Sequence, residues 1–278
     1  MAKLYIGSSA WLDIMPFFEY KGTKIHYVDV DKRTDTKPGI PVVFVHGAGS
    51  SHLIWALQLR EFSKTNRTIA LDLSGHGKSE NAKGEPSIDP TYTEEVGAIV
   101  DHLNLERFVL VGHSMGGGVA MCYTLKKDAQ KPLALVLVDT SSDLDLSKFK
   151  AGLVKETIED RVYFFKSRIF ENYTESYQLK KLDDDMRLAH PTVMARDLAA
   201  CSKFNISDRL GEIDIPAFVL VGSNDDIITP AIAAGFKKRL PRADLAVVKG
   251  ADHIPMVEQP EEFNRLFRKF LEWASKNA

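Results

Sequence analysis

A short apolar run that ends in a glycine–serine–glycine turn constrains this chain more than any other feature. Residues 108–111 (Phe-Val-Leu-Val) have the composition of a buried parallel strand, and residues 115–127 have the pattern of a helix. Between them, residues 112–116 read Gly-His-Ser-Met-Gly. A sharp strand-to-helix turn strains its central residue, and a side chain on either glycine would collide with the neighbouring strand or helix. The pattern predicts that the Ser114 hydroxyl stands clear of the sheet at a helix N-terminus, where a developing anion is favoured.

An ordinary glycine-rich turn would give the same five letters, so the surrounding pattern decides between the two interpretations. Residues 17–30 alternate apolar and polar positions around a turn, which predicts an antiparallel edge hairpin. Beyond it, strands and helices alternate, and this predicts an α/β fold with a mostly parallel sheet covered by helices on both faces. Strands are predicted at 41–45, 67–73, 133–138, 216–221 and 245–248, and helices at 52–63, 91–103, 230–240 and 260–274.

One segment interrupts this alternation. Residues 141–212 are charged and mostly helical in pattern, with no obvious strand, and they are too many for a plain crossover connection. The sequence therefore predicts a helical cap (lid) inserted at 141–212 into a core formed by residues 1–140 and 213–278.

Composition excludes several classes of function. The 278 residues carry a formal net charge of −2 and no long basic run, so nucleic acid and anionic membrane surfaces are not expected partners. No window approaches 18 consecutive apolar residues and the N-terminus does not fit a signal peptide, so no transmembrane segment is expected. The two cysteines, Cys122 and Cys201, have neither metal-ligand spacing nor a disulfide framework. This fits a reducing compartment, and we expect a cytoplasmic protein.

Three further loops at the carboxyl ends of predicted strands carry residues that suit serine catalysis, and such loops meet at one edge of a parallel sheet. A serine hydroxyl needs a base, and His253 follows the last strand. The base needs an acid, and Asp225 and Asp226 follow the preceding strand, while Asp139 is a third candidate. A lone loop histidine is usually an exposed residue and a lone aspartate usually a turn residue. The order Ser, Asp, His, each just beyond a strand, favours the catalytic interpretation.

The loop after the strand at 41–45 completes this set. It reads His-Gly-Ala-Gly at residues 46–49, and its small side chains let the backbone approach a substrate oxygen. The N–H of Ala48 is expected to pair with the N–H of Met115 as an oxyanion hole. Backbone donors leave no side-chain signature, so this is the least sequence-specific part of the site.

Together these segments resemble the α/β-hydrolase-fold serine hydrolases, in particular the small capped microbial carboxylesterases and monoacylglycerol lipases. The resemblance implies that Ser114 is the nucleophile, His253 the base, and Ala48 and Met115 the oxyanion donors. It covers nearly the whole chain except the predicted cap, and it rests on residues 46–47, 72–79, 112–117, 222–225 and 252–260.

The resemblance also bears on the acid. The family usually places it three residues after the glycine that ends the strand, which favours Asp225; counting four residues back from Pro230 gives Asp226 as the alternative. The chain departs from the family at Asp252, where glycine usually precedes the histidine. His113 is interpreted as a packing residue beside the turn. Asp72 and His76 are interpreted as parts of a structural turn of the fold, not as a second active site.

The expected function is hydrolysis of short- to medium-chain carboxylic esters through an acyl-enzyme intermediate, with a small-molecule ester as substrate and with no metal or cofactor. A serine nucleophile argues against the epoxide hydrolases and haloalkane dehalogenases of the same fold, which use aspartate. An acyl-thioesterase is the alternative enzyme, and a small-ligand receptor without catalysis is the alternative of a different class. We expect a monomer or a homodimer.

Overall fold

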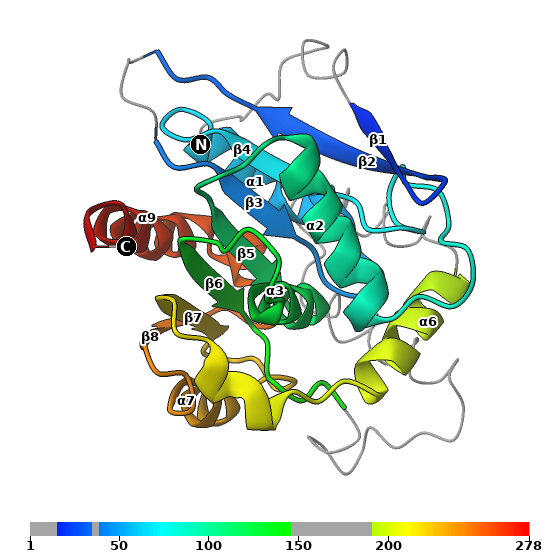
Figure 1. The fold of residues 1–278 in the computed structure, drawn as a ribbon. Coiled ribbons are helices and arrows are strands. Elements are labelled where there is room, and N and C mark those ends of the chain that lie inside the picture. The colour runs from blue at the N-terminus through cyan, green and yellow to red at the C-terminus, as the bar shows by residue number, and fades with distance from the viewer. Residues whose placement is uncertain (1–15, 35–38, 146–190, 278) are drawn as a thin grey trace.

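An eight-stranded sheet forms the centre of the protein (Figure 1). The computed structural model describes residues 16–34, 39–145 and 191–277. Most of the predicted cap, residues 146–190, lies outside this part of the chain, so the cap remains a prediction.

The sheet has the order β1-β2-β4-β3-β5-β6-β7-β8. The first two strands form the predicted edge hairpin, β2 pairs antiparallel with β4, and every pair from β4 to β8 is parallel. This confirms the mostly parallel α/β sheet. The strands are β1 (Phe17–Tyr20), β2 (Thr23–Val30), β3 (Val42–Val45), β4 (Thr68–Leu71), β5 (Val109–His113), β6 (Ala134–Val138), β7 (Ala217–Gly222) and β8 (Ala243–Val248).

Helices cover both faces of the sheet (Figure 1). α2 packs on α3 on one face, and α1 packs on α9 on the other. None of the described helices has the length and apolarity needed to cross a membrane. The helices and helical turns are η1 (His52–Trp55), α1 (Ala56–Phe62), η2 (Ile88–Tyr92), α2 (Thr93–His102), α3 (Met115–Leu125), α6 (Pro191–Ser202), η4 (Ser207–Glu212), α7 (Pro230–Lys237), α8 (Pro255–Glu258) and α9 (Pro260–Asn277).

Two helical segments differ in detail from their predicted form. The helix predicted at 52–63 begins as the 3-10 turn η1 and becomes α-helical only at α1. Within this turn Ile54 is buried and Leu53 is half-buried. The helical turn α8 was not predicted, because four residues are too few for a helical period to be visible in the sequence.

The order of the strands creates one special position at the carboxyl edge. The chain runs from β3 outward to β4, and then returns past β3 to place β5 on the other side. Ligands of open α/β sheets bind in the crevice beside such a reversal of strand order. The loop after β3 and the turn after β5 flank this reversal, and the register aligns their starts, with Val45 opposite Gly112.

Candidate active site

Ser114 occupies the sharp turn between β5 and α3. Its backbone has φ 50° and ψ −117°, which is strained for a residue other than glycine. The turn is held in place because the Ser114 N–H donates to the carbonyl of Val138 at the end of β6, and the Thr140 hydroxyl donates to the Ser114 carbonyl. The side chain is half-buried, whereas the residues on either side of it are buried. The sequence prediction of a strained, lifted serine therefore agrees with the geometry.

The two glycines of the turn are needed for close packing, as expected. A Cβ on Gly112 would lie 2.2 Å from the carbonyl oxygen of Gly116, inside the first turn of α3. A Cβ on Gly116 would lie 2.4 Å from the carbonyl oxygen of His46, at the end of β3. Both contacts are with backbone atoms, so a larger residue at either position would force the helix or the strand to move.

Two side chains from distant loops converge on Ser114. His253 Nε2 lies 3.2 Å from Ser114 Oγ, and His253 Nδ1 lies 2.8 Å from Asp225 Oδ2. The Asp225 contact assigns the ring proton to Nδ1, so Nε2 can accept the proton of the Ser114 hydroxyl. The serine follows β5, the aspartate follows β7 and the histidine follows β8, so loops at the ends of three strands supply one hydrogen-bonded row.

The turn after β7 distinguishes the two aspartates that the sequence left open. Asp225 is buried, and its second carboxylate oxygen, Oδ1, accepts the N–H groups of Ile227 and Ile228 at 2.8 and 3.0 Å. These two bonds fix the carboxylate with Oδ2 facing His253. Asp226 is half-buried on the same turn. The geometry therefore favours Asp225 as the partner of the histidine.

The pKa values of the pair follow from burial and mutual attraction. Burial alone would lower the pKa of His253, but the Asp225 carboxylate outweighs it, and Asp252 and Glu258 act in the same direction, so this pKa is raised. Burial alone would raise the pKa of Asp225, but His253 outweighs it and the pKa is lowered. Asp252, the residue that departs from the family, thus favours the charged form of the histidine.

A further carboxyl group, Asp139, lies behind this pair. It follows β6 with φ 43°, is fully buried, and accepts the Gly222 N–H at 2.9 Å. One oxygen of Asp139, one oxygen of Asp225 and one ring nitrogen of His253 lie within 4.8 Å of one another. Burial and the Asp225 charge raise the pKa of Asp139 well above its ordinary value. These shifts favour the neutral form of Asp139 and the charged form of Asp225, whose carboxylate faces the histidine.

Two residues that sequence reasoning did not assign to the site hold the His253 loop. The His113 ring donates from Nε2 to the His253 carbonyl at 2.8 Å, and burial lowers the pKa of His113 to about 3, so this ring is neutral. Glu258 accepts the N–H groups of Asp252 and Ile254. The packing role predicted for His113 is thus a specific one, because it fixes the backbone of the histidine beside the serine.

The loop that follows β3 lies against the same serine. Residues 46–51 are all buried, and a Cβ on Gly47 would come within 3.2 Å of the Ser114 Cβ. Ala48, one of the two expected oxyanion donors, lies in this loop, and Met115, the other, is the first residue of α3. Both are buried. The structure thus brings the two segments that carry the expected donors to the side of Ser114.

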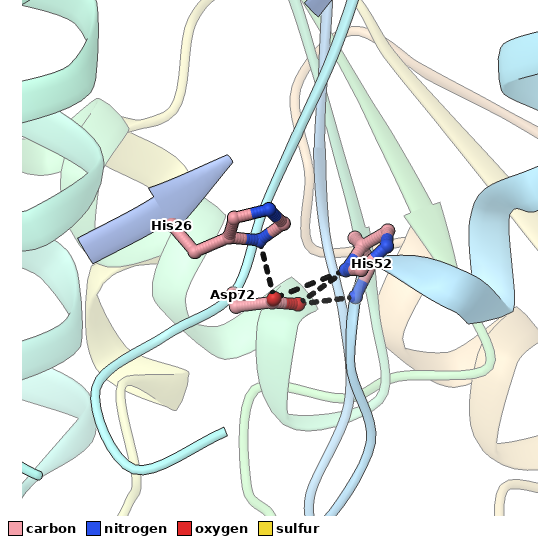
Figure 2. A group of neighbouring side chains, drawn as sticks. All are labelled: His26, His52 and Asp72. Carbon is pink, nitrogen blue, oxygen red and sulfur yellow. Dashed lines mark hydrogen bonds and ion pairs between the residues drawn. The ribbon is translucent and has the colours of Figure 1, made fainter. Parts of the chain in front are cut away.

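A second histidine–carboxylate cluster lies outside this site (Figure 2). The rings of His26, on β2, and His52, at the start of η1, both point at the carboxylate of Asp72. The Nδ1 atoms of the two rings lie 2.7 and 2.8 Å from the nearer carboxylate oxygens. Two backbone N–H groups, of His52 and Lys78, donate to the same carboxylate at 2.7 and 3.1 Å.

These four donors give the cluster a structural character. A carboxylate has about four lone-pair sites, and in Asp72 each oxygen already receives two N–H groups. Burial raises the pKa of Asp72, but the hydrogen bonds from both histidines outweigh it and the pKa falls far below its ordinary value. Two histidines and an aspartate are suitable metal ligands, but here the ring nitrogens that face the carboxylate act as donors. The prediction that this turn is structural agrees with these contacts.

Comparison with known proteins identifies the family. Residues 42–266 match the alpha/beta hydrolase family. The chain belongs to this family. Among solved structures, this alpha/beta hydrolase is similar to a thermophilic esterase at 28% identity and a TM-score of 0.76, over 94% of this chain and 98% of the other. It is also similar to a structure described as an N-acyl homoserine lactone degrading enzyme, at 26% identity and a TM-score of 0.75, over 92% of this chain and 100% of the other.

A curated relative shows how far this alpha/beta hydrolase family extends. The non-heme chloroperoxidase of Streptomyces lividans is 29% identical over 269 residues, which are 87% of this chain and 94% of that protein. Relatives of similar identity therefore carry names of different activities. Family membership supports hydrolase activity, and the choice of substrate has to be argued from the site.

Proposed function

We propose that this protein is a carboxylesterase that hydrolyses short- to medium-chain carboxylic esters through Ser114. The observation that carries the proposal is the continuous row from Ser114 Oγ to His253 Nε2, at 3.2 Å, and from His253 Nδ1 to Asp225 Oδ2, at 2.8 Å. Acyl transfer from an ester requires a nucleophile, a base and an orienting acid that lie within hydrogen-bond distance of one another.

In the acylation half-reaction, Ser114 Oγ attacks the ester carbonyl carbon while its proton moves to His253 Nε2. The tetrahedral intermediate then collapses, the bond from the carbonyl carbon to the alkoxy oxygen breaks, and His253 gives its proton to the departing alcohol. Asp225 keeps the ring in the tautomer that presents Nε2 and stabilises the imidazolium that forms. The charged form of Asp225 is favoured because His253 outweighs burial and lowers the Asp225 pKa, while burial and the Asp225 charge raise the pKa of the neighbouring Asp139.

In the deacylation half-reaction, His253 takes a proton from water as the water oxygen attacks the acyl carbon. Collapse of the second tetrahedral intermediate breaks the bond to Ser114 Oγ, which recovers its proton from His253, and the carboxylic acid leaves. We assign the oxyanion of both intermediates to the N–H groups of Ala48 and Met115. These steps need neither a metal nor a cofactor.

The burial of both cysteines supports a proposal on localisation. Cys122 and Cys201 are free thiols, and burial raises both of their pKa values, to about 12 for Cys122. Such thiols are inert and unpaired, which is usual for proteins of a reducing compartment. We therefore propose a cytoplasmic protein.

The test is hydrolysis of p-nitrophenyl acetate, butyrate and octanoate by the wild type and by Ser114→Ala. Ser223→Ala is the matched control, because Ser223 lies on the same edge of the sheet, after β7, and its hydroxyl bonds to the neighbouring Asn224 side chain. We expect the wild type and Ser223→Ala to turn over at similar rates and Ser114→Ala to be inactive.

Two other results would redirect the proposal. Faster Ser114-dependent turnover of acyl thioesters than of matched oxygen esters would make the protein a thioesterase. No turnover of either class by the wild type, together with tight binding of an unchanged ligand, would contradict the esterase and support a receptor.

A further inference from the structure

A buried carboxylate that no part of the proposed reaction uses lies close to the expected oxyanion loop. Asp197, on α6, is fully buried. Its Oδ2 accepts the N–H of Gly49 at 2.8 Å, and the two residues are 148 positions apart in the chain. Figure 1 shows α6 apart from the helices that cover the sheet. This one carboxylate therefore joins α6 to the loop that follows β3.

The Asp197 contact fixes one of the two peptide groups that flank Ala48. The preceding peptide group is held because the Gly47 carbonyl accepts His46 Nδ1–H at 2.8 Å and the Ser50 N–H at 3.3 Å. The following peptide group is held because the Gly49 N–H donates to Asp197. In a trans peptide the C=O and N–H point in opposite directions, so fixing the Gly47 carbonyl fixes the direction of the Ala48 N–H.

The conformation of the loop makes this second contact necessary. Gly49 has φ +60°, a region that glycine enters freely, so the residue itself supplies little rigidity. Met194, on the same helix as Asp197, packs on it, and a Cβ on Gly49 would lie 2.4 Å from Met194 Cε. The helix α6 therefore limits the loop both by packing and by a charged hydrogen bond.

The charge of Asp197 is compensated by groups from the core. His76 Nε2 lies 2.7 Å from Asp197 Oδ2, while His76 Nδ1 lies 3.1 Å from the Ser74 carbonyl, so both ring nitrogens act as donors. The Tyr92 hydroxyl donates to Asp197 Oδ1 at 2.7 Å. Burial alone would favour neutral forms of both residues, but their attraction raises the pKa of His76 and lowers that of Asp197. A charge-assisted bond of this kind holds a backbone N–H about twice as strongly as a neutral one.

We propose that Asp197 is a positioning residue for the oxyanion hole: from α6 it holds the peptide group that follows Ala48 and, together with the bonds on the Gly47 carbonyl, keeps the Ala48 N–H in the direction that the tetrahedral intermediate requires. The inference rests on the proposed esterase function. A donor that serves only the intermediate affects kcat and leaves ground-state binding of the ester unchanged.

The experiment compares Asp197→Asn with Tyr92→Phe. Both variants weaken the same buried network, but Tyr92→Phe removes a bond to Oδ1 and leaves the Gly49 contact on Oδ2. With p-nitrophenyl butyrate we expect Asp197→Asn to lower kcat about 10- to 100-fold with KM within about 3-fold, because losing a whole oxyanion donor costs roughly 100- to 1000-fold. Tyr92→Phe should keep kcat within about 2-fold. In Asp197→Asn, the affinity for a boronic acid that forms a tetrahedral adduct with serine should fall together with kcat. In Tyr92→Phe, this affinity should not change.

A second variant covers the possibility that Asp197→Asn does not fold, since a lone charge on His76 would then be buried. The double variant Asp197→Asn/His76→Gln replaces the ion pair by two amides, and exchanging both partners is far better tolerated than removing one. It should show the same loss of kcat. A folded Asp197 variant with the kcat and boronate affinity of the wild type would overturn the inference and would not affect the proposed esterase function. A wild type without ester turnover would overturn both.

Discussion

Two of the buried histidine–aspartate contacts among the described residues have nearly equal length, but only one of the two lies beside a serine hydroxyl. His253 Nδ1 is 2.8 Å from Asp225, and His26 Nδ1 is 2.7 Å from Asp72. The difference lies at the other ring nitrogen. His253 Nε2 faces the Ser114 hydroxyl, whereas His26 Nε2 has no hydrogen-bond partner among the described residues.

The two carboxylates differ as well. Asp72 receives two N–H groups on each oxygen, so its bonds tie β2, η1 and the loop after β4 together. One oxygen of Asp225 accepts two backbone N–H groups, and the other oxygen contacts His253. The catalytic role that we propose for one pair and the structural role of the other thus differ by what the second ring nitrogen of each histidine contacts.

The largest expected effect separates the two histidines. His253→Ala should lower kcat/KM for p-nitrophenyl butyrate roughly 10⁶-fold, because nucleophile and base act as a unit. His26→Leu, the matched change in the other contact, should keep kcat/KM within about 2-fold and lower the free energy of unfolding by about 1–2 kcal/mol, since Asp72 loses one donor. Steady-state kinetics and urea unfolding measure both. Similar activity losses in the two variants would contradict the distinction.

The next effect concerns the two neighbouring aspartates. Asp225→Asn should lower kcat roughly 10⁴-fold, because an amide cannot hold the histidine in the required tautomer. Asp226→Asn, one position away on the same turn, should keep kcat within about 3-fold. The same ester assay on both variants decides the matter. A severe loss in Asp226→Asn with an active Asp225→Asn would move the acid to Asp226.

The structural cluster should respond in stability. Asp72→Asn should lower the free energy of unfolding by about 3 kcal/mol, because an amide NH₂ would face N–H donors in a buried site. The lowered pKa of Asp72 means that its contribution to stability is present above its unfolded-state pKa and is lost as pH falls through its much lower folded-state pKa. Urea unfolding at pH 7 and at pH 3 measures both statements. Unchanged stability at pH 7 would contradict the role assigned to this carboxylate.

The smallest effect is a shift of the pH profile. The base must be neutral to accept the Ser114 proton, so kcat/KM should fall as pH drops through the His253 pKa. Because Asp225 raises that pKa above 6.5, the acidic limb should lie above pH 6.5. In Asp225→Asn the limb of the residual activity should move to lower pH. A limb that stays in place would show that Asp225 does not set the charge on this ring.

The sequence predicted the features that depend on neighbouring residues. The strand, turn and helix around Ser114 were predictable because an apolar run, two glycines at fixed spacing and a helical pattern follow one another within 20 residues. The same holds for the order of the strands in the chain, and for the positions of Asp225 and His253 just beyond strand ends.

Contacts between distant segments were not predictable. The family spacing favoured Asp225 and left Asp226 as the alternative, and only the folded turn shows which of them faces His253. The role of Asp197 depends on a helix that packs against a loop 148 residues earlier, and no local pattern marks it. His26 and Asp72 are joined across 46 residues in the same way.

The proposed mechanism requires that Ser114 carries the acyl group. Wild-type protein mixed with p-nitrophenyl acetate and quenched in acid within the first turnovers should carry a single acetyl group by intact mass. Peptide mapping should place it on Ser114, and Ser114→Ala should carry none. An acetyl group on another residue, or ester turnover that survives in Ser114→Ala, would contradict this mechanism.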